Sequence, residues 1–167
     1  MKYIDNYLEQ YNKGIKEKGI YLSGNFGSGK TYLISALFNE LAKSNVKSVI
    51  IYWPEYLRSL KSSYSSSSND EFKNKYNEVK YAKLLLIDDL GAETVTSWSR
   101  DEILGTILQY RMQENLPTFI TSNLDIKELE DHLSGGSKAE KVKSRRIMER
   151  INQLTIDIKM IANNYRK

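Results

Sequence analysis

The residues best placed to do chemistry are eight consecutive positions, GNFGSGKT, that run from Gly24 to Thr31. They match the pattern G-x-x-x-x-G-K-[ST] at every fixed position, and this pattern is typical of loops that hold the phosphates of a nucleotide. Glycines let the backbone turn tightly, so that successive N–H groups can point at one anion. An apolar stretch precedes the loop and a helix-period segment follows it, which is the context that the pattern requires.

We therefore expect this loop to bind ATP and Mg²⁺. We expect Lys30 to contact the β- and γ-phosphates and Thr31 to be a ligand of the metal. The cofactor-binding residues predicted from the loop are Gly24, Asn25, Phe26, Gly27, Ser28, Gly29, Lys30 and Thr31.

Two adjacent acids follow a second apolar run about 60 residues after the loop. Four apolar residues, 84–87, lead directly into Asp88 and Asp89. We expect Asp88 to face the metal and Asp89 to orient the attacking water or to accept its proton. Because aspartate is one methylene shorter than the glutamate common in this role, we expect hydrolysis to be slow.

Asn123 follows the strand expected at residues 117–122 and ends the polar triplet Thr121-Ser122-Asn123. An amide at this position can donate and accept hydrogen bonds at once, so it could contact the γ-phosphate or the attacking water. A turn residue in front of a helix cap at Asp125 is an equally good interpretation. The sequence leaves these two possibilities open.

Apolar runs and helix-period segments alternate along the rest of the chain. Strands are expected at residues 20–23, 46–53, 83–88, 117–122 and 154–161, with helices at 1–13, 32–43, 54–61, 71–80, 99–114, 125–133 and 139–153. The serine-rich segment 62–70 predicts a mobile loop, and the alternation in 154–161 predicts an edge strand.

This order of elements predicts an α/β protein with a five-stranded, mostly parallel sheet sandwiched by helices. Its ligand should bind beyond the carboxyl ends of the strands, where the glycine-rich loop lies.

Composition limits the class of protein. The 167 residues suit one domain, and the absence of cysteine excludes a disulfide framework or a thiolate nucleophile. With no secretory signal and no run long enough to span a bilayer, we expect a cytoplasmic protein without a membrane partner. Residues 138–150 hold six basic and two acidic side chains. They indicate either a solvated helix face or a surface for polyanions.

Several longer segments carry a resemblance to a known family. The loop, the two-acid strand and the asparagine-tipped strand together resemble the AAA+ ATPases. The chain is more specifically similar to the bacterial replicative helicase loaders in the segments 87–93, 97–101, 108–112, 117–123 and 141–151.

The resemblance implies a P-loop NTPase fold of the AAA+ type, with residues 1–167 as a single ATPase domain. Few residues follow the last strand, so the helical lid is expected to be minimal or absent. The loaders carry an N-terminal domain that grips the replicative DNA helicase, and no such domain is expected within this chain. The resemblance also implies self-association, with ATP at the interfaces between subunits.

Three arginines gain a role from the resemblance. Arg150 matches the arginine finger, which would reach the nucleotide of a neighbouring subunit as a catalytic residue. Arg146, one helical turn earlier, is the alternative finger. Arg166 resembles a second sensor that touches the nucleotide of its own subunit.

Four residues are implied as contacts to single-stranded DNA. Tyr64 and Trp98 fall where the loaders hold aromatic rings against bases, and a stacked base contributes about 1–3 kcal/mol without sequence preference. Lys141 and Lys143 would contact DNA phosphates. Core packing of Trp98 remains the alternative for that residue.

The predicted function is that of an ATP-hydrolysing domain that assists the loading of a replicative helicase. A transposition helper ATPase with a similar core is an alternative. A small-molecule kinase would need arginines in a mobile lid, and the segment from Ser62 to Lys80 has none. A module that holds ATP without turnover is a further alternative.

Overall fold

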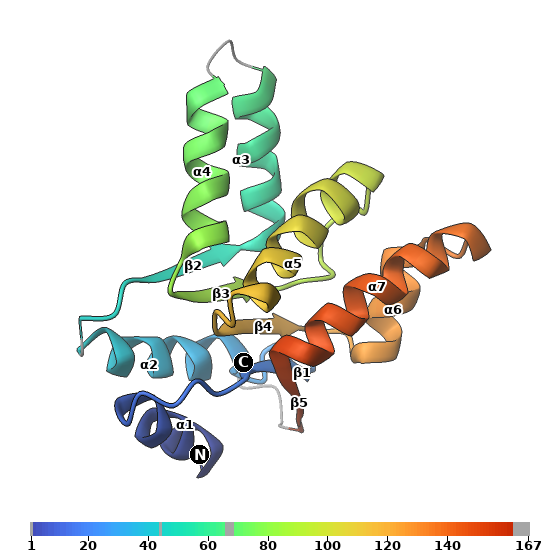
Figure 1. The fold of residues 1–167 in the computed structure, drawn as a ribbon. Coiled ribbons are helices and arrows are strands. Elements are labelled where there is room, and N and C mark those ends of the chain that lie inside the picture. Colours follow the sequence, from blue (N-terminus) through green and yellow to red (C-terminus); the bar gives the residue numbers. More distant parts are fainter. Residues whose placement is uncertain (1, 44, 66–68, 162–167) are drawn as a thin grey trace.

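The computed structural model describes residues 2–43, 45–65 and 69–161, and it is built around a five-stranded sheet (Figure 1). The strand order is β2-β3-β4-β1-β5, and each neighbouring pair runs parallel. The strands are β1 (Gly19–Gly24), β2 (Ser48–Tyr52), β3 (Leu84–Asp88), β4 (Thr118–Ser122) and β5 (Thr155–Met160). The predicted α/β class and parallel sheet are confirmed.

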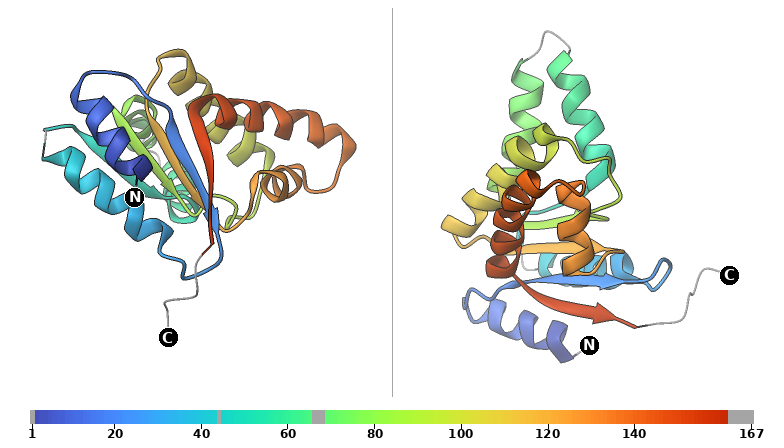
Figure 2. Two further views of the ribbon diagram at one scale, coloured as in Figure 1. Left: turned by 90° about the horizontal axis from the view of Figure 1, so that it is seen from below. Right: turned by 90° about the vertical axis from the view of Figure 1, so that its right-hand side faces the viewer.

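Helices connect these strands and cover both faces of the sheet (Figures 1 and 2). They are α1 (Lys2–Asn12), α2 (Lys30–Ala42), α3 (Trp53–Ser65), α4 (Asn69–Tyr81), the π-helix η1 (Trp98–Leu104), α5 (Gly105–Gln113), α6 (Ile126–Ser134) and α7 (Lys138–Leu154). Within the described residues, no helix is long and apolar enough to cross a bilayer.

Strand β3 shows why the sheet is buried on both faces. Leu84 and Leu86 pack in one core cluster with α1 and α2, whereas Leu85 and Ile87 pack in a second cluster with the other helices. Successive side chains of a strand point to opposite faces, so an uninterrupted apolar run is what a doubly covered strand needs. The predicted helical sandwich is therefore confirmed.

Strand β5 lies at the edge of the sheet, as its alternating sequence predicts. It pairs with β1 alone among the described residues, and its side chains are mostly exposed or half-buried. Because β5 runs parallel to β1, its end at Met160 comes beside Gly24. The last strand therefore finishes next to the glycine-rich loop.

The serine-rich segment corrects one prediction. Residues 62–65 continue α3 and residues 69–70 begin α4, while 66–68 lie outside the described residues. Ser63 and Ser65 donate hydrogen bonds to the carbonyls four residues earlier, Ser59 (2.9 Å) and Lys61 (3.0 Å), which lets serine remain in a helix. Helices α3 and α4 form a hairpin that projects beyond the sheet (Figure 1).

The helix expected at 99–114 is also divided. Its first part, η1, has π geometry, in which the Gly105 N–H donates to the Arg100 carbonyl, and α5 follows. The apolar stripe continues across the change, so sequence periodicity alone could not detect the wider turn. A π-helix within an α-helix often accompanies a functional region.

A buried arginine on α5 joins the ends of several elements. Arg111 is fully buried, and its guanidinium donates to the carbonyls of Ala82 (2.7 Å) and Pro117 (2.8 Å) and to the Thr118 hydroxyl (2.8 Å). Burial lowers the pKa of Arg111 to about 9. The arginine thus holds α5 against the chain just before β3 and β4.

Candidate active site

The glycine-rich loop connects the carboxyl end of β1 to the first turn of α2, as its sequence context predicts. Gly29, immediately before α2, has a φ of 89°. A Cβ at Gly29 would meet nothing closer than the Met160 methyl carbon at 3.9 Å, so glycine is required by the backbone conformation rather than by lack of space. The loop therefore has the tight turn expected of a phosphate cradle.

A pocket of about 670 Å³ opens beside this loop. Loop residues 26–31 line it together with polar groups from the ends of β3 and β4, and with Tyr52 and Met160 from the ends of β2 and β5. The carboxyl ends of parallel strands are where such folds bind their ligands. The predicted loop, acids and asparagine meet at this pocket.

Lys30 is buried at the base of the pocket, with 7% of its surface exposed. Its ammonium donates to the carbonyls of Gly24 (2.7 Å) and Asn25 (2.9 Å) and to the side-chain oxygen of Asn123 (2.9 Å). These acceptors are uncharged, so only the donor of each bond carries a charge, and an ion pair with phosphate would be stronger. Lys30 is thus positioned to exchange these contacts for phosphate oxygens.

The two predicted metal ligands lie in direct contact. The Thr31 hydroxyl donates to the Asp88 carboxylate at 2.8 Å, and the Thr121 hydroxyl donates to the same oxygen at 2.6 Å. No cluster of three or more metal-binding side chains occurs in the part of the chain that the structure describes. Mg²⁺ is commonly held by one or two carboxylates together with substrate phosphates, so Thr31 and Asp88 fit this ion.

Asp89 begins the turn after β3 and has a positive φ of 60°. Its carboxylate accepts a hydrogen bond from the Asn123 amide at 2.8 Å and another from the Tyr52 hydroxyl at 3.4 Å. Its backbone N–H donates to Thr121 at 3.0 Å. Asn123 therefore connects Lys30 to Asp89 by accepting from one and donating to the other.

Two residues of this network escape sequence reasoning. Thr121 lies at the second-last position of β4, where its hydroxyl donates to the Asp88 carboxylate and accepts from the backbone N–H of Asp89. Tyr52 ends β2, and the sequence predicted only that it lies in a strand over residues 46–53. A polar group at the end of each neighbouring parallel strand is the signal that could have identified them.

Arg150 lies on α7, outside this pocket. Its guanidinium donates to the Gly105 carbonyl at 2.8 Å, and burial, with a smaller effect of Arg146, lowers the pKa of Arg150. Arg150 lines a separate pocket of about 340 Å³ that, among the described residues, has no member in common with the first. Arg166 falls outside the described residues, as does the segment in which the reduced lid was expected.

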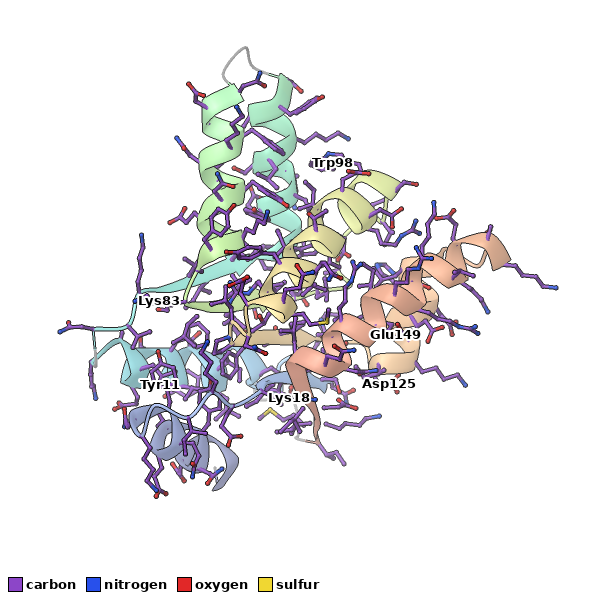
Figure 3. All side chains as sticks on the ribbon, in the orientation of Figure 1. Tyr11, Lys18, Lys83, Trp98, Asp125 and Glu149 are labelled. Atoms are coloured by element: carbon purple, nitrogen blue, oxygen red, sulfur yellow. The ribbon has the colours of Figure 1, made fainter. Side chains whose placement is uncertain are left out.

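The predicted DNA-binding residues come from three separate elements. Tyr64 on α3 is 69% exposed, and its ring packs edge-on against Phe72 with centroids 5.8 Å apart. Trp98 begins η1 (Figure 3), and its side chain is half-buried against the core. Lys141 and Lys143 lie on α7. These positions do not test whether DNA binds, so the four contacts stay predictions.

Lys143 belongs to a charged network that the sequence did not reveal. Arg100, 3% exposed, donates two hydrogen bonds to Asp101 (2.7 and 2.8 Å) and one to Glu140. Lys143 lies 3.7 Å from Asp101 and 3.5 Å from Glu140. Hydrogen bonding to Arg100 lowers the pKa of both carboxyl groups. The network fastens η1 to α7.

Comparison with known proteins agrees with this geometry. A sequence profile described as the bacterial DnaA ATPase domain matches residues 9–144. The replicative helicase loader DnaI of Bacillus subtilis strain 168 is 44% identical over 167 residues, which are 99% of this chain and 53% of that protein. The chain thus spans about half the length of this relative.

Solved structures show the same fold. A crystal structure of DnaI is 48% identical and has a TM-score of 0.85, with coverage of 96% of this chain and 82% of that one. A replication initiator DnaA bound to AMPPCP and single-stranded DNA is 19% identical, with a TM-score of 0.74 and coverage of 98% and 46%. This second likeness shows the fold alone.

The loop, the two acids and the asparagine thus share one pocket in a fold of the AAA+ type, and the profile and the DnaI likeness extend over most of the chain. This chain belongs to the DnaI family of bacterial replicative helicase loaders.

Proposed function

We propose that this chain binds and slowly hydrolyses ATP, and that it uses this cycle to help place a replicative helicase on single-stranded DNA. One observation carries the proposal: Lys30, Thr31, Asp88 and Asn123 converge on one pocket. The identity to DnaI favours helicase loading over a transposition helper role. The helicase would be held through a domain outside these residues.

Binding would begin with the loop. Its backbone N–H groups and the N-terminus of α2 would attract the phosphates, and Lys30 would exchange its carbonyl contacts for the β- and γ-phosphate oxygens. Thr31 and Asp88 would hold Mg²⁺, which neutralises phosphate charge when it is bound. AMPPCP, a triphosphate analogue, is bound by the DnaA neighbour, in agreement with a nucleotide at this pocket.

Hydrolysis would depend on the turn after β3. Asp89 would orient the attacking water or accept its proton, while Asn123 would contact the γ-phosphate or that water. In the described structure the Asn123 amide is bonded to both Lys30 and Asp89. Movement of Lys30 onto phosphate would therefore free the Asn123 oxygen for a new contact.

The remaining parts of the proposal involve other molecules. Arg150 of a neighbouring copy would complete the active site, which makes turnover depend on self-association. Tyr64 and Trp98 would stack on DNA bases, and Lys141 and Lys143 would neutralise DNA phosphates. The DnaA neighbour binds single-stranded DNA, in keeping with such a surface in this fold.

The test of nucleotide binding is isothermal calorimetry with Mg·ATP, followed by ATPase assays over a range of protein concentrations with and without single-stranded DNA. We expect binding by the wild type and none by Lys30→Ala. Turnover per subunit should rise steeply with protein concentration, and Arg150→Ala should bind ATP without turning it over. No binding heat from well-folded wild-type protein would refute the proposed function.

DNA binding needs its own measurement. Trp98→Ala should weaken binding to single-stranded DNA with little change in its salt dependence. Lys141→Ala should lower the slope of log affinity against log salt by about one, because one phosphate contact is lost. Unchanged affinity in both variants would refute these contacts.

A further inference from the structure

We propose that Lys80, which lines the same pocket as Arg150, is the second cation of an anion site that receives the terminal phosphate of a nucleotide held by another copy of this chain. The inference rests on the proposed function, since it assumes ATP in the loop pocket, and it adds a residue to the shared site. Lys80 belongs to none of the segments that the family resemblance singled out.

The site is the open pocket of about 340 Å³ lined by residues of α4, η1, α5 and α7. Most of its lining side chains can donate hydrogen bonds. They are Lys80, Thr106, Gln109, Tyr110, Gln113 and Arg150, with Asp101 as the acidic member. Such a set of donors suits an anion rather than an apolar ligand.

Lys80 is held in this pocket by aromatic rings. Its ammonium lies 4.9 Å from the ring centroid of Tyr110, 5.3 Å from that of Tyr81 and 5.7 Å from that of Tyr76. The Tyr76 and Thr106 hydroxyls are hydrogen-bonded at 2.6 Å. Cation–π contacts attract the ammonium through the ring quadrupole, but they do not neutralise its charge.

The charge of Lys80 is therefore still available to a ligand. Among the described residues, no carboxylate forms an ion pair with Lys80, whereas Lys75 on the same helix pairs with Glu71 at 2.7 Å. A lysine that is held in place by three rings loses less freedom when it binds an anion, so more of the attraction appears as affinity.

Arg150 supplies the second charge. Its guanidinium donates to the Gly105 carbonyl. The guanidinium also packs so closely on Gly105 that a Cβ at this position would lie 3.2 Å from it and 3.1 Å from the side chain of Ile147. Asp101, which could have neutralised the pocket, already accepts two hydrogen bonds from Arg100. The uncompensated charge of this pocket is therefore positive.

The position of the pocket shows why the phosphate must come from another copy. Lys80 precedes β3 and Arg150 precedes β5, so both lie near the amino ends of the strands, whereas the glycine-rich loop lies at the carboxyl ends. A chain cannot close this pocket over its own nucleotide. Head-to-tail association of identical subunits brings two different surfaces of the chain together, as this arrangement requires.

The test uses Lys80→Met, which keeps an unbranched apolar stem over the rings and removes the charge. We expect ATP affinity by calorimetry to be unchanged and kcat at saturating protein to fall about 10- to 100-fold, since a charge aimed at the reacting phosphate is lost. Lys80→Arg, which keeps a cation, should recover part of the rate. Lys73→Met, at an exposed lysine of α4, is the matched control and should match the wild type.

A mixing experiment identifies the donor of the cation. Lys30→Ala subunits lack a working loop but keep Lys80, whereas Lys80→Met subunits have the reverse defect. In a head-to-tail assembly of equal amounts, about one interface in four combines an intact loop with an intact Lys80, so the mixture should exceed the summed activities of its components.

Three results would overturn the inference in different ways. Wild-type turnover in Lys80→Met, with Lys30→Ala inactive, would refute the role of Lys80 and leave the proposed function intact. A mixture no more active than its components would refute the action between copies. If Lys80→Met had normal turnover but bound single-stranded DNA more weakly than the wild type, the pocket would be assigned to a nucleic-acid phosphate. Absence of turnover in the wild type would instead refute the proposed function.

Discussion

Lys30 and Arg111 are both buried cations that bond to uncharged oxygens, yet they lie at opposite ends of the sheet and differ in what they can do. Lys30 contacts the carbonyls of Gly24 and Asn25 beside a large pocket. Arg111 contacts carbonyls that are enclosed by packed elements. The chemistry of the contacts is similar. What makes Lys30 a binding residue and Arg111 a structural one is whether an anion can reach the side chain, and not the kind of oxygen that the side chain contacts.

The largest stability effect should follow from Arg111→Met, which fills the space but removes the donors. We expect a loss of about 4 kcal/mol or more, because each buried acceptor left unsatisfied costs about 1–3 kcal/mol. Urea unfolding measures this loss, and calorimetry at low temperature should show that the folded variant still binds ATP. A loss below about 1 kcal/mol would remove the distinction between the two cations.

Lys30→Met should show the opposite pattern. The loop carbonyls that it leaves face a pocket that water can enter, so the free energy of unfolding should change by about 1 kcal/mol or less. ATP affinity should fall at least about a hundredfold, since the charge that binds the phosphates is gone. The same urea and calorimetry measurements apply. A stability loss as large as that of Arg111→Met would contradict the comparison.

Asn123→Ala should separate binding from turnover at the pocket. We expect kcat to fall about 10- to 100-fold, because the amide that orients Asp89 is lost, and ATP affinity to change less. Tyr52→Phe removes only the contact at 3.4 Å and should change kcat about twofold or less. Steady-state kinetics on both variants provides the check, and equal losses would show that Asp89 depends on the tyrosine as well.

A third buried cation, Arg100, extends the comparison because its partners are carboxylates. The pKa values of Asp101 and Glu140 are lowered in the folded state from reference values of 3.8 and 4.5. The stability that they contribute is therefore present above about pH 4.5 and is lost as the pH falls through the lower folded values.

Arg100→Met should flatten this acid dependence, whereas Arg111→Met should leave it unchanged. Urea unfolding between pH 3 and pH 6 measures the slope of the free energy of unfolding against pH. The change in this slope is the smallest of the effects expected here. The same slope in the wild type, Arg100→Met and Arg111→Met would show that other carboxylates control acid unfolding.

Much of the fold could be predicted because its signals are local. The doubly buried run at Leu84–Ile87, the alternation of β5 and the cap at Asp125 each depend on a few adjacent residues. Because the carboxyl ends of parallel strands lie at the same end of a sheet, the sequence could also predict that the loop, the two acids and Asn123 come together there.

Other features depend on partners far along the chain. The hydroxyl of Ser63 contacts Lys75, and this contact helps to make a helix of a segment whose composition suggested a loop. The roles of Arg100 and Lys80 depend on neighbours from other helices. Thr121 and Tyr52 are likewise defined by contacts across strands, which a linear pattern does not contain.

The π-helix η1 has a consequence for any change in chain length. Its i→i−5 hydrogen bond takes up one residue more than an α-helical turn would, so a single deletion within it would restore regular winding and leave the segments on either side in nearly the same register. A single deletion in α5 would instead rotate everything upstream of it by about 100°, because each residue of an α-helix turns the chain by about that angle. Removing one amino acid should therefore do less damage in η1 than in α5.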